Sequence, residues 1–184
     1  KLTERKYFTF AGGINRGKGF QDFIDLINYA YENNLKYKFK IITSCNIKSY
    51  LKNLNKNAFN LVVINNSEHI TDYELNKAHA ESVGFFLLHN TATQSGGMTM
   101  AFMHGTPVIA RNIKAFSQYI IHKKNSYLVR KNFLLKDLVE AMEYLSKNQN
   151  SLSIESRKIF EEQFSDKNWE NNYKMIFGNL QDSI

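Results

Sequence analysis

Short runs of apolar residues recur along the chain, and longer segments that follow a different period separate them. The runs are four or five residues long at most positions, and they contain few polar interruptions. Continuous apolar runs of this length are typical of strands that are buried on both faces of a parallel sheet. The runs predict strands at residues 7–11, 39–43, 61–64, 85–88, 107–110 and 127–129.

The segments between these runs carry apolar residues at three- and four-residue spacing, which is typical of a helix with one buried face. The first such segment has Phe20, Phe23, Ile24, Ile27 and Ala30 in this pattern. Another opens with Thr71 and has Glu74 three residues later, the two side chains of a capping box. The pattern predicts helices at residues 20–30, 49–54, 71–82, 98–104, 115–121, 134–148 and 154–164, and from 166 or 167 to about 180.

Alternating strands and helices predict an α/β fold: a Rossmann-like, doubly wound parallel sheet with helices on both faces and a helical C-terminal tail. The last helix would carry Trp169, Tyr173, Ile176 and Phe177 on one face. Two glycine-rich turns, residues 12–19 and 95–97, follow predicted strands. In such sheets ligands bind beyond the carboxyl ends of the strands, so both turns are candidates for one binding site.

Composition narrows the class of protein. The chain of 184 residues is long enough for one compact domain, has a formal net charge of +7 and contains a single cysteine, Cys45. The excess of cations favours anionic partners such as nucleotide phosphates, nucleic acid or an acidic membrane face. We interpret Cys45 as a reduced structural thiol. Without a signal-peptide pattern or an apolar run long enough to span a membrane, the sequence predicts a cytoplasmic location.

The first glycine-rich turn offers two cations next to a helix start. Its glycines are spaced wrongly for G-x-G-x-x-G, and Lys18 is followed by Gly19 rather than by the Ser or Thr of a P-loop. Arg16 and Lys18 remain as a pair that can neutralise a diphosphate. The plainer alternative is two solvated basic side chains on a flexible loop. In the second turn, Ser95, Gly96 and Gly97 precede a helix, whose free amides and positive dipole end attract anions. The alternative is an ordinary strand-to-helix turn, in which glycine is used only because the backbone is tight.

The order of four short motifs resembles that in the C-terminal, donor-binding domain of GT-B glycosyltransferases. The motifs are Ala11-Gly12-Gly13-Ile14, Lys18-Gly19-Phe20, Glu74-Leu75 and the block from Gly105 to Ala110. The similarity is to the retaining enzymes of the family 4 type, and it extends over nearly the whole chain. By this resemblance Lys18 contacts the donor diphosphate. The loop that holds the distal phosphate or the sugar corresponds to Ser95, Gly96 and Gly97.

The chain departs from the pattern of this family at three positions. Two acidic residues that flank the family's glycine-rich loop, the second of which binds the ribose, correspond here to Ala92 and Met100. The family's frequent arginine in the first turn is Gly13 here, although Arg16 can reach the same phosphates. Divergent members have a T-Q-S-G turn, and Thr93, Gln94, Ser95 and Gly96 look like that variant.

The resemblance implies a glycosyltransferase domain that binds a UDP-, GDP- or ADP-linked sugar and stabilises the departing diphosphate without a metal or another cofactor. His69 and Ile70 lie on the loop that packs on the base in this family. His89 can face the sugar. For His69 and His89 alike, a loop or strand-end histidine with local hydrogen bonds is the plainer alternative, and His79 and His104 are interpreted as packing or surface residues. No catalytic residue is assigned. The predicted donor-binding residues are Gly12, Gly13, Arg16, Lys18, His69, Ile70, Thr93, Gln94, Ser95, Gly96 and Gly97.

Residues 1–184 are expected to form this donor-binding domain alone, with the acceptor domain of the enzyme outside the sequence. The acceptor is expected to be a glycan or a lipid-linked sugar of polysaccharide biosynthesis, with peripheral contact to the inner membrane face. One alternative is a degenerate, non-catalytic binding module that uses its basic surface for a protein or an anionic membrane. A third hypothesis is that the chain is one half of a sugar-nucleotide epimerase. Nucleic acid is not an expected partner, because basic and aromatic residues do not cluster on a predicted strand.

Overall fold

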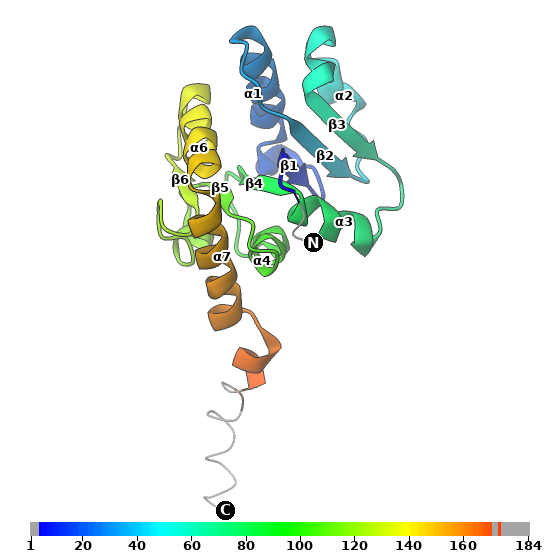
Figure 1. The fold of residues 1–184 in the computed structure, drawn as a ribbon. Helices are drawn as coiled ribbons and strands as arrows, with labels where there is room; N and C mark the ends of the chain where they lie inside the picture. The colour runs from blue at the N-terminus through cyan, green and yellow to red at the C-terminus, as the bar shows by residue number, and fades with distance from the viewer. Residues whose placement is uncertain (1–3, 171–172, 174–184) are drawn as a thin grey trace, which may run out of the picture.

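The fold is a single parallel sheet with helices on both faces, as Figure 1 shows for a computed structural model of the chain. The structure describes residues 4–170 and Tyr173, without the side chain of Arg16. The strands are β1 (Tyr7–Ala11), β2 (Phe39–Thr43), β3 (Val62–Asn66), β4 (Ser82–Leu87), β5 (Val108–Arg111) and β6 (Tyr127–Val129). All six predicted strands are therefore present, with β4 beginning three residues earlier than the sequence indicated.

The strand order is β3-β2-β1-β4-β5-β6, and every neighbouring pair is parallel. The chain moves outward from β1 to β3, then returns to the centre with β4 and moves outward the other way. The order reverses between β1 and β4, and the loops after these two strands lead away from each other on opposite faces. A crevice forms at such a point because no crossover connection covers it. The predicted Rossmann-like fold is confirmed.

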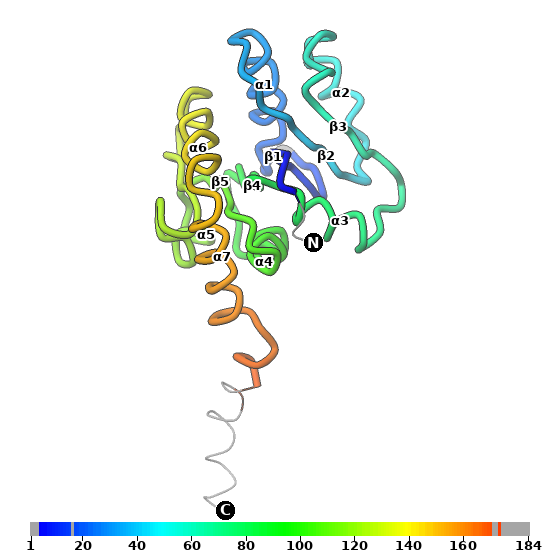
Figure 2. The backbone as a smooth tube through the Cα atoms, viewed as in Figure 1, coloured from blue at the N-terminus to red at the C-terminus, as the bar shows by residue number. Residues whose placement is uncertain are grey.

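Helices cover both faces of the sheet. They are α1 (Phe20–Glu32), α2 (Lys48–Leu51), α3 (Asp72–Ala80), α4 (Gly96–Met103), α5 (Lys114–Ser117), α6 (Leu135–Lys147) and α7 (Gln149–Gln163), with 3₁₀ turns η1 (Arg16–Lys18) and η2 (Lys56–Leu61). One core cluster joins α1 and α6 to the sheet, and a second joins α4 to residues of α5 and α7. Figure 2 shows the same arrangement of helices and strands as a backbone trace.

Two predicted helix boundaries differ from the structure for identifiable reasons. The predicted helix 115–121 ends at Ser117, because the side chain of Asn125 bonds the backbone of Tyr119 and Ile121 at 2.9 Å each and holds a turn instead. Helix α7 begins at Gln149 rather than at 154, since its polar first turn lacks the apolar spacing that signals a helix. The predicted loop after β1 contains the ordered turn η1.

The predicted C-terminal helix lies only partly within the described residues. Residues 166–170 are helical, and the Trp169 ring, which is 70% exposed, stacks on Tyr173 with ring centroids 5.8 Å apart. Ile176 and Phe177, expected on the same face, lie outside the described residues. Among the described helices, none is both long and apolar enough to cross a membrane.

Candidate functional site

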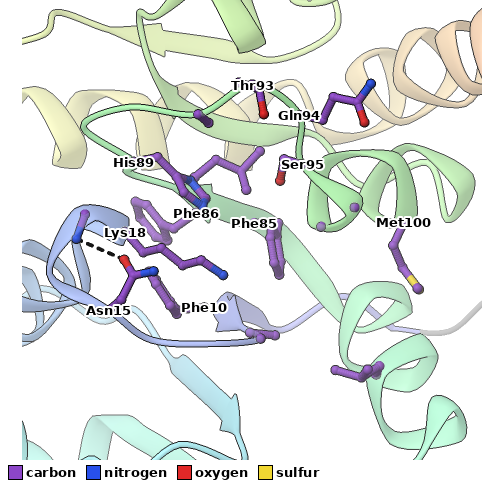
Figure 3. A pocket seen from close by; sticks show the side chains of 18 of the residues that line it. Phe10, Asn15, Lys18, Phe85, Phe86, His89, Thr93, Gln94, Ser95 and Met100 are labelled. Atoms are coloured by element: carbon purple, nitrogen blue, oxygen red, sulfur yellow. Dashed lines mark hydrogen bonds between the residues drawn. The ribbon is translucent and has the colours of Figure 1, made fainter.

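A cavity of about 500 Å³ lies at the point where the strand order reverses. Its floor includes the ends of β1 and β4, and its walls are the turn after β1, the turn after β4 and the facing sides of α3 and α4. Figure 3 shows Lys18, Phe85 and Ser95 directed into it from three different elements. Cavities of this size hold ligands of the size of a nucleotide.

The turn after β1 places one cation in the cavity. Asn15 caps η1, and its Oδ1 accepts a hydrogen bond of 2.9 Å from the Gly17 amide (Figure 3). This cap fixes the path of the backbone up to Lys18. The Lys18 ammonium then lies over Gly13, 3.4 Å from the position that a Cβ on Gly13 would take. Glycine at position 13 therefore leaves room for the lysine head group at the cavity wall.

Several hydrogen bonds tie this first turn to the neighbouring strands. The Gly12 amide donates to the Ile42 carbonyl at 2.9 Å, and the Gly12 carbonyl accepts from the Thr43 hydroxyl at 2.8 Å. The Ile14 amide donates to Cys45 Sγ at 3.2 Å, which gives Cys45 the structural role predicted for it. The turn is held by β2 on one side before any ligand is present.

Glycine is required where the first turn enters α1. Gly19 has φ of +70°, and a Cβ there would lie 2.4 Å from the Leu88 carbonyl oxygen. The start of α1 thus presses against the end of β4. The buried Arg111 holds the same carbonyl from the other side, because its Nε donates to Leu88 O at 3.2 Å and its guanidinium pairs with Asp22 at 2.8 Å.

The turn after β4 is built differently. It is joined to the first turn by one backbone bond, from the Asn90 amide to the Gly17 carbonyl at 2.8 Å. The described chain supplies no hydrogen-bond partner for residues 91–94, which project at the cavity rim. Ser95 then caps α4, with the Met98 amide donating to its side chain at 3.4 Å. The free amides of Gly96 and Gly97 begin a helix whose positive dipole end lies at the cavity.

Two histidines line the cavity, and both are held neutral. Burial, aided by the charge of Lys18, lowers the pKa of His89 to about 4. Burial, aided by the charge of His104, lowers the pKa of His79 to about 3. In each ring Nδ1 is buried and has no hydrogen-bond partner among the residues that the structure describes. Lys18 is therefore the only formal charge among the described side chains that line this cavity.

A second hollow of about 300 Å³ adjoins the first, and Gly12 and Leu75 line both. Its wall includes Gly13, His69 and Ile70, three of the residues that the resemblance assigned to the donor. Glu68 also lines this hollow and is its acidic side chain. The two hollows together form one elongated site at the carboxyl edge of the sheet.

The predicted donor residues gather at this elongated site. The main cavity contains Gly12, Lys18, Thr93, Gln94, Ser95, Gly96 and Gly97, and the second hollow contains Gly12, Gly13, His69 and Ile70. Arg16 begins η1, and its side chain lies outside the described part of the chain. Ala92 and Met100, at the positions of the absent carboxylates, line the main cavity as well. That these residues bind a donor stays a prediction.

Sequence reasoning missed Asn15 and His79 as lining residues, and it left His89 undecided. The Asn15 cap had a signal, because asparagine two residues before glycine is a common turn former. His79 packs as expected, with its ring 4.4 Å from the Phe85 ring, yet it also faces the cavity. No sequence signal shows this, because α3 has a weak apolar pattern and both of its faces are partly covered.

The chain matches one family model and several solved structures. The family model described as "Glycosyl transferases group 1" matches residues 1–165. A comparison with curated protein sequences gave no match. Among solved structures, TarM is similar with a TM-score of 0.71 and 20% identity, over 96% of this chain and 37% of TarM.

Two further structures show the same fold. The C-terminal domain of LpcC from Francisella tularensis, a group 1 family glycosyl transferase, has a TM-score of 0.70 and 15% identity over 89% of each chain. The pneumococcal O-GlcNAc transferase GtfA, solved in complex with UDP and GlcNAc, has a TM-score of 0.71 and 14% identity over 97% of this chain and 38% of its own. The chain thus spans well under half the length of TarM and GtfA.

Proposed function

The chain belongs to the group 1 glycosyl transferases, and on that basis we propose that it binds the nucleotide-sugar donor of such an enzyme. One observation carries the proposal: the cavity between the ends of β1 and β4 combines a single cation, the amino end of α4 and a set of neutral hydrogen-bonding side chains. This combination suits a ligand with one anionic part and one hydroxylated, uncharged part. A sugar attached to a nucleoside diphosphate has both.

The donor fits the elongated site in one direction. We place the diphosphate between Lys18 and the Gly96 and Gly97 amides, because these are the positive groups of the cavity. The base then enters the second hollow beside His69 and Ile70. The sugar lies at the outer turn, where Thr93 and Gln94 of the T-Q-S-G sequence lack hydrogen-bond partners within the described chain. The UDP bound to GtfA supports a nucleoside diphosphate as ligand.

The work of this domain in the reaction is to stabilise the leaving diphosphate. As the bond between the sugar and the diphosphate breaks, negative charge grows on the diphosphate oxygens. Lys18 and the α4 amides are fixed in place before this happens, so little reorganisation is needed. They supply positive charge that a metal ion supplies elsewhere, and we propose a metal-independent, retaining transfer to a glycan or lipid-linked acceptor. The acceptor domain is proposed to lie on another part of the enzyme, so that this chain alone binds but does not transfer.

The non-catalytic binding module is not favoured, because the family match and the preformed cavity both point to a transferase. The predicted cytoplasmic location and peripheral membrane contact stay predictions.

Calorimetric titration with UDP, GDP, ADP and their sugars tests donor binding. We expect one of the three nucleotides to bind, and Lys18→Ala to weaken it about 10- to 100-fold, since a charged hydrogen bond contributes roughly 1.5–3 kcal/mol. Lys36→Ala is the matched control, because Lys36 is exposed and precedes β2 at the opposite edge of the sheet. Addition of EDTA should leave the affinity unchanged. If none of the nucleotides binds at millimolar concentration, the proposal is wrong.

A further inference from the structure

The imidazole of His79 is a buried polar group without a partner. It lies on α3, its exposed fraction is 3%, and it lines the main cavity. The side chain makes no hydrogen bond with the described chain, and Nδ1 is enclosed. The residue's one hydrogen bond with a side chain goes to its backbone carbonyl, which accepts from the Thr106 hydroxyl at 2.6 Å.

The neighbours of the His79 ring leave one direction in which a partner can be found. One neighbour is the Phe85 ring, with centroids 4.4 Å apart and the planes at 36°. Another is the His104 ring, which is parallel at 6.2 Å and whose own Nε2 is bonded to Asn76 at 2.8 Å. Neither neighbour offers a hydrogen bond to His79. Because Nδ1 is enclosed by protein, a ligand in the cavity that His79 lines can reach the ring only at Nε2.

An imidazole in this position costs stability, and a ligand can offset part of that cost only through Nε2, since Nδ1 is enclosed by protein. Burying an unpaired polar group costs roughly 1–3 kcal/mol, and phenylalanine would fill a similar space beside Phe85 without that cost. A neutral imidazole has one donor and one acceptor nitrogen, and a hydroxyl group can satisfy either. A phosphate offers acceptors only and is better met by Lys18. The partner that suits His79 is therefore an uncharged hydroxyl.

The position of His79 along the site decides which hydroxyl this is. Leu75 lies one helical turn earlier on α3, four residues before His79, so the two side chains share a face of the helix. Leu75 lines both hollows and marks the border between them. With the base in the second hollow and the diphosphate at Lys18, the ribose lies at this border.

We propose that His79 is a specificity-determining residue that hydrogen-bonds a ribose hydroxyl of the nucleotide. His79 lines the same cavity as Met100, and the described lining of that cavity contains no acidic side chain. The inference rests on the proposed donor binding. It goes further by assigning recognition of the ribose to a neutral ring on α3.

The test compares UDP with 2′-deoxy-UDP and 3′-deoxy-UDP by calorimetry, for the wild-type chain and for His79→Phe and His79→Gln. The wild type should bind UDP about 5- to 20-fold more tightly than one of the two deoxynucleotides, as expected for one hydrogen bond. In His79→Phe, UDP affinity should fall to that of the deoxynucleotide, whose own affinity stays unchanged. His79→Gln, which keeps a donor and an acceptor, should retain part of the discrimination. His104→Phe is the matched control, because His104 does not line this cavity.

A second measurement on the unaltered chain covers the case in which a variant fails to fold. The imidazole ¹⁵N resonances of His79 should shift on addition of UDP and shift less with the deoxynucleotide that binds weakly. If GDP or ADP binds in place of UDP, its deoxy forms are used. Equal discrimination in wild type and His79→Phe, or no discrimination in the wild type, overturns this inference and leaves donor binding intact. Failure of UDP, GDP and ADP alike to bind overturns both.

Discussion

Two turns border the cavity, residues 12–19 after β1 and residues 89–95 after β4, and the chain holds the first much more tightly than the second. The first is bonded to β2, capped by Asn15 and pressed against Leu88 through Gly19. The second has one backbone bond to the first turn and a long cap at Ser95. The tightly held turn carries the cation, and the loosely held turn carries neutral hydroxyl and amide groups.

The contrast separates two tasks of one site. A cation that must meet a diphosphate gains from being fixed in advance, since no ordering is then needed on binding. Groups that meet a sugar at the open rim have unused hydrogen-bonding capacity, which a ligand or another domain can take up. Affinity for the phosphates should therefore depend on the first turn, and recognition of the sugar on the second.

Alanine at the glycine that ends the first turn, compared with alanine at the glycine that follows the second turn, gives the largest expected difference in stability. Gly19→Ala should lower the free energy of unfolding by about 3 kcal/mol or more, because a left-handed φ and a Cβ 2.4 Å from Leu88 O are both unfavourable. Gly96→Ala should leave it unchanged or raise it by up to about 1 kcal/mol, since the residue is helical and no atom lies within 4 Å of the new Cβ. Urea denaturation measures both. Equal losses would contradict the contrast between the turns.

Acid should weaken the fold through the buried His79 and the half-buried His89. Their folded-state pKa values lie below the ordinary 6.5, so the unfolded chain binds more protons as the pH falls. The stability that the two neutral rings contribute is present above pH 6.5 and is lost as the pH falls toward the folded-state pKa, about 4 for His89 and about 3 for His79. Between pH 7 and pH 5 the loss due to His79 should be about 2 kcal/mol. The loss due to His89, which is more exposed, should be smaller, although its charge would also repel Lys18.

Denaturation curves at pH 7 and pH 5 for the wild type, His79→Phe and His89→Asn check this ranking. The loss on acidification should shrink most in His79→Phe and less in His89→Asn. A wild-type stability that does not change between these two pH values would show that neither ring resists protonation.

Loss of the side-chain cap of each turn should change the free energy of unfolding by a smaller amount. Asn15→Ala should cost about 1 kcal/mol, the usual effect of losing a side-chain cap, because its bond to Gly17 is 2.9 Å long. Ser95→Ala should cost about half as much, since the corresponding bond is 3.4 Å. Asn15→Ala should also weaken nucleotide binding, because the path to Lys18 is no longer fixed. A larger loss in Ser95→Ala would reverse the assignment of the rigid turn.

The sequence predicted the sheet well because parallel strands buried on both faces leave continuous apolar runs, as at residues 85–88 and 107–110. It also predicted the capping box of Thr71 and Glu74, which the structure confirms, since that signal is local. It could not predict the cavity-facing role of His79 or the close approach of Gly19 to Leu88. Both depend on contacts between segments about 6 to 70 residues apart, which leave no periodic signal in either segment.

The smallest effect on stability should come from the outer part of the second turn. Gln94→Ala should change the free energy of unfolding by less than about 0.5 kcal/mol, because the described chain offers Gln94 no hydrogen bond to lose. If the turn instead recognises the sugar, the same variant should bind the nucleotide sugar about 3- to 10-fold more weakly while its affinity for the free nucleotide stays the same. Calorimetry with UDP and with a UDP-sugar distinguishes a loss of sugar recognition from a loss of nucleotide binding. Gln118→Ala is the control, because Gln118 is exposed and does not line the cavity. Equal weakening for both ligands would place Gln94 at the phosphates, and the division of tasks between the turns would then fail.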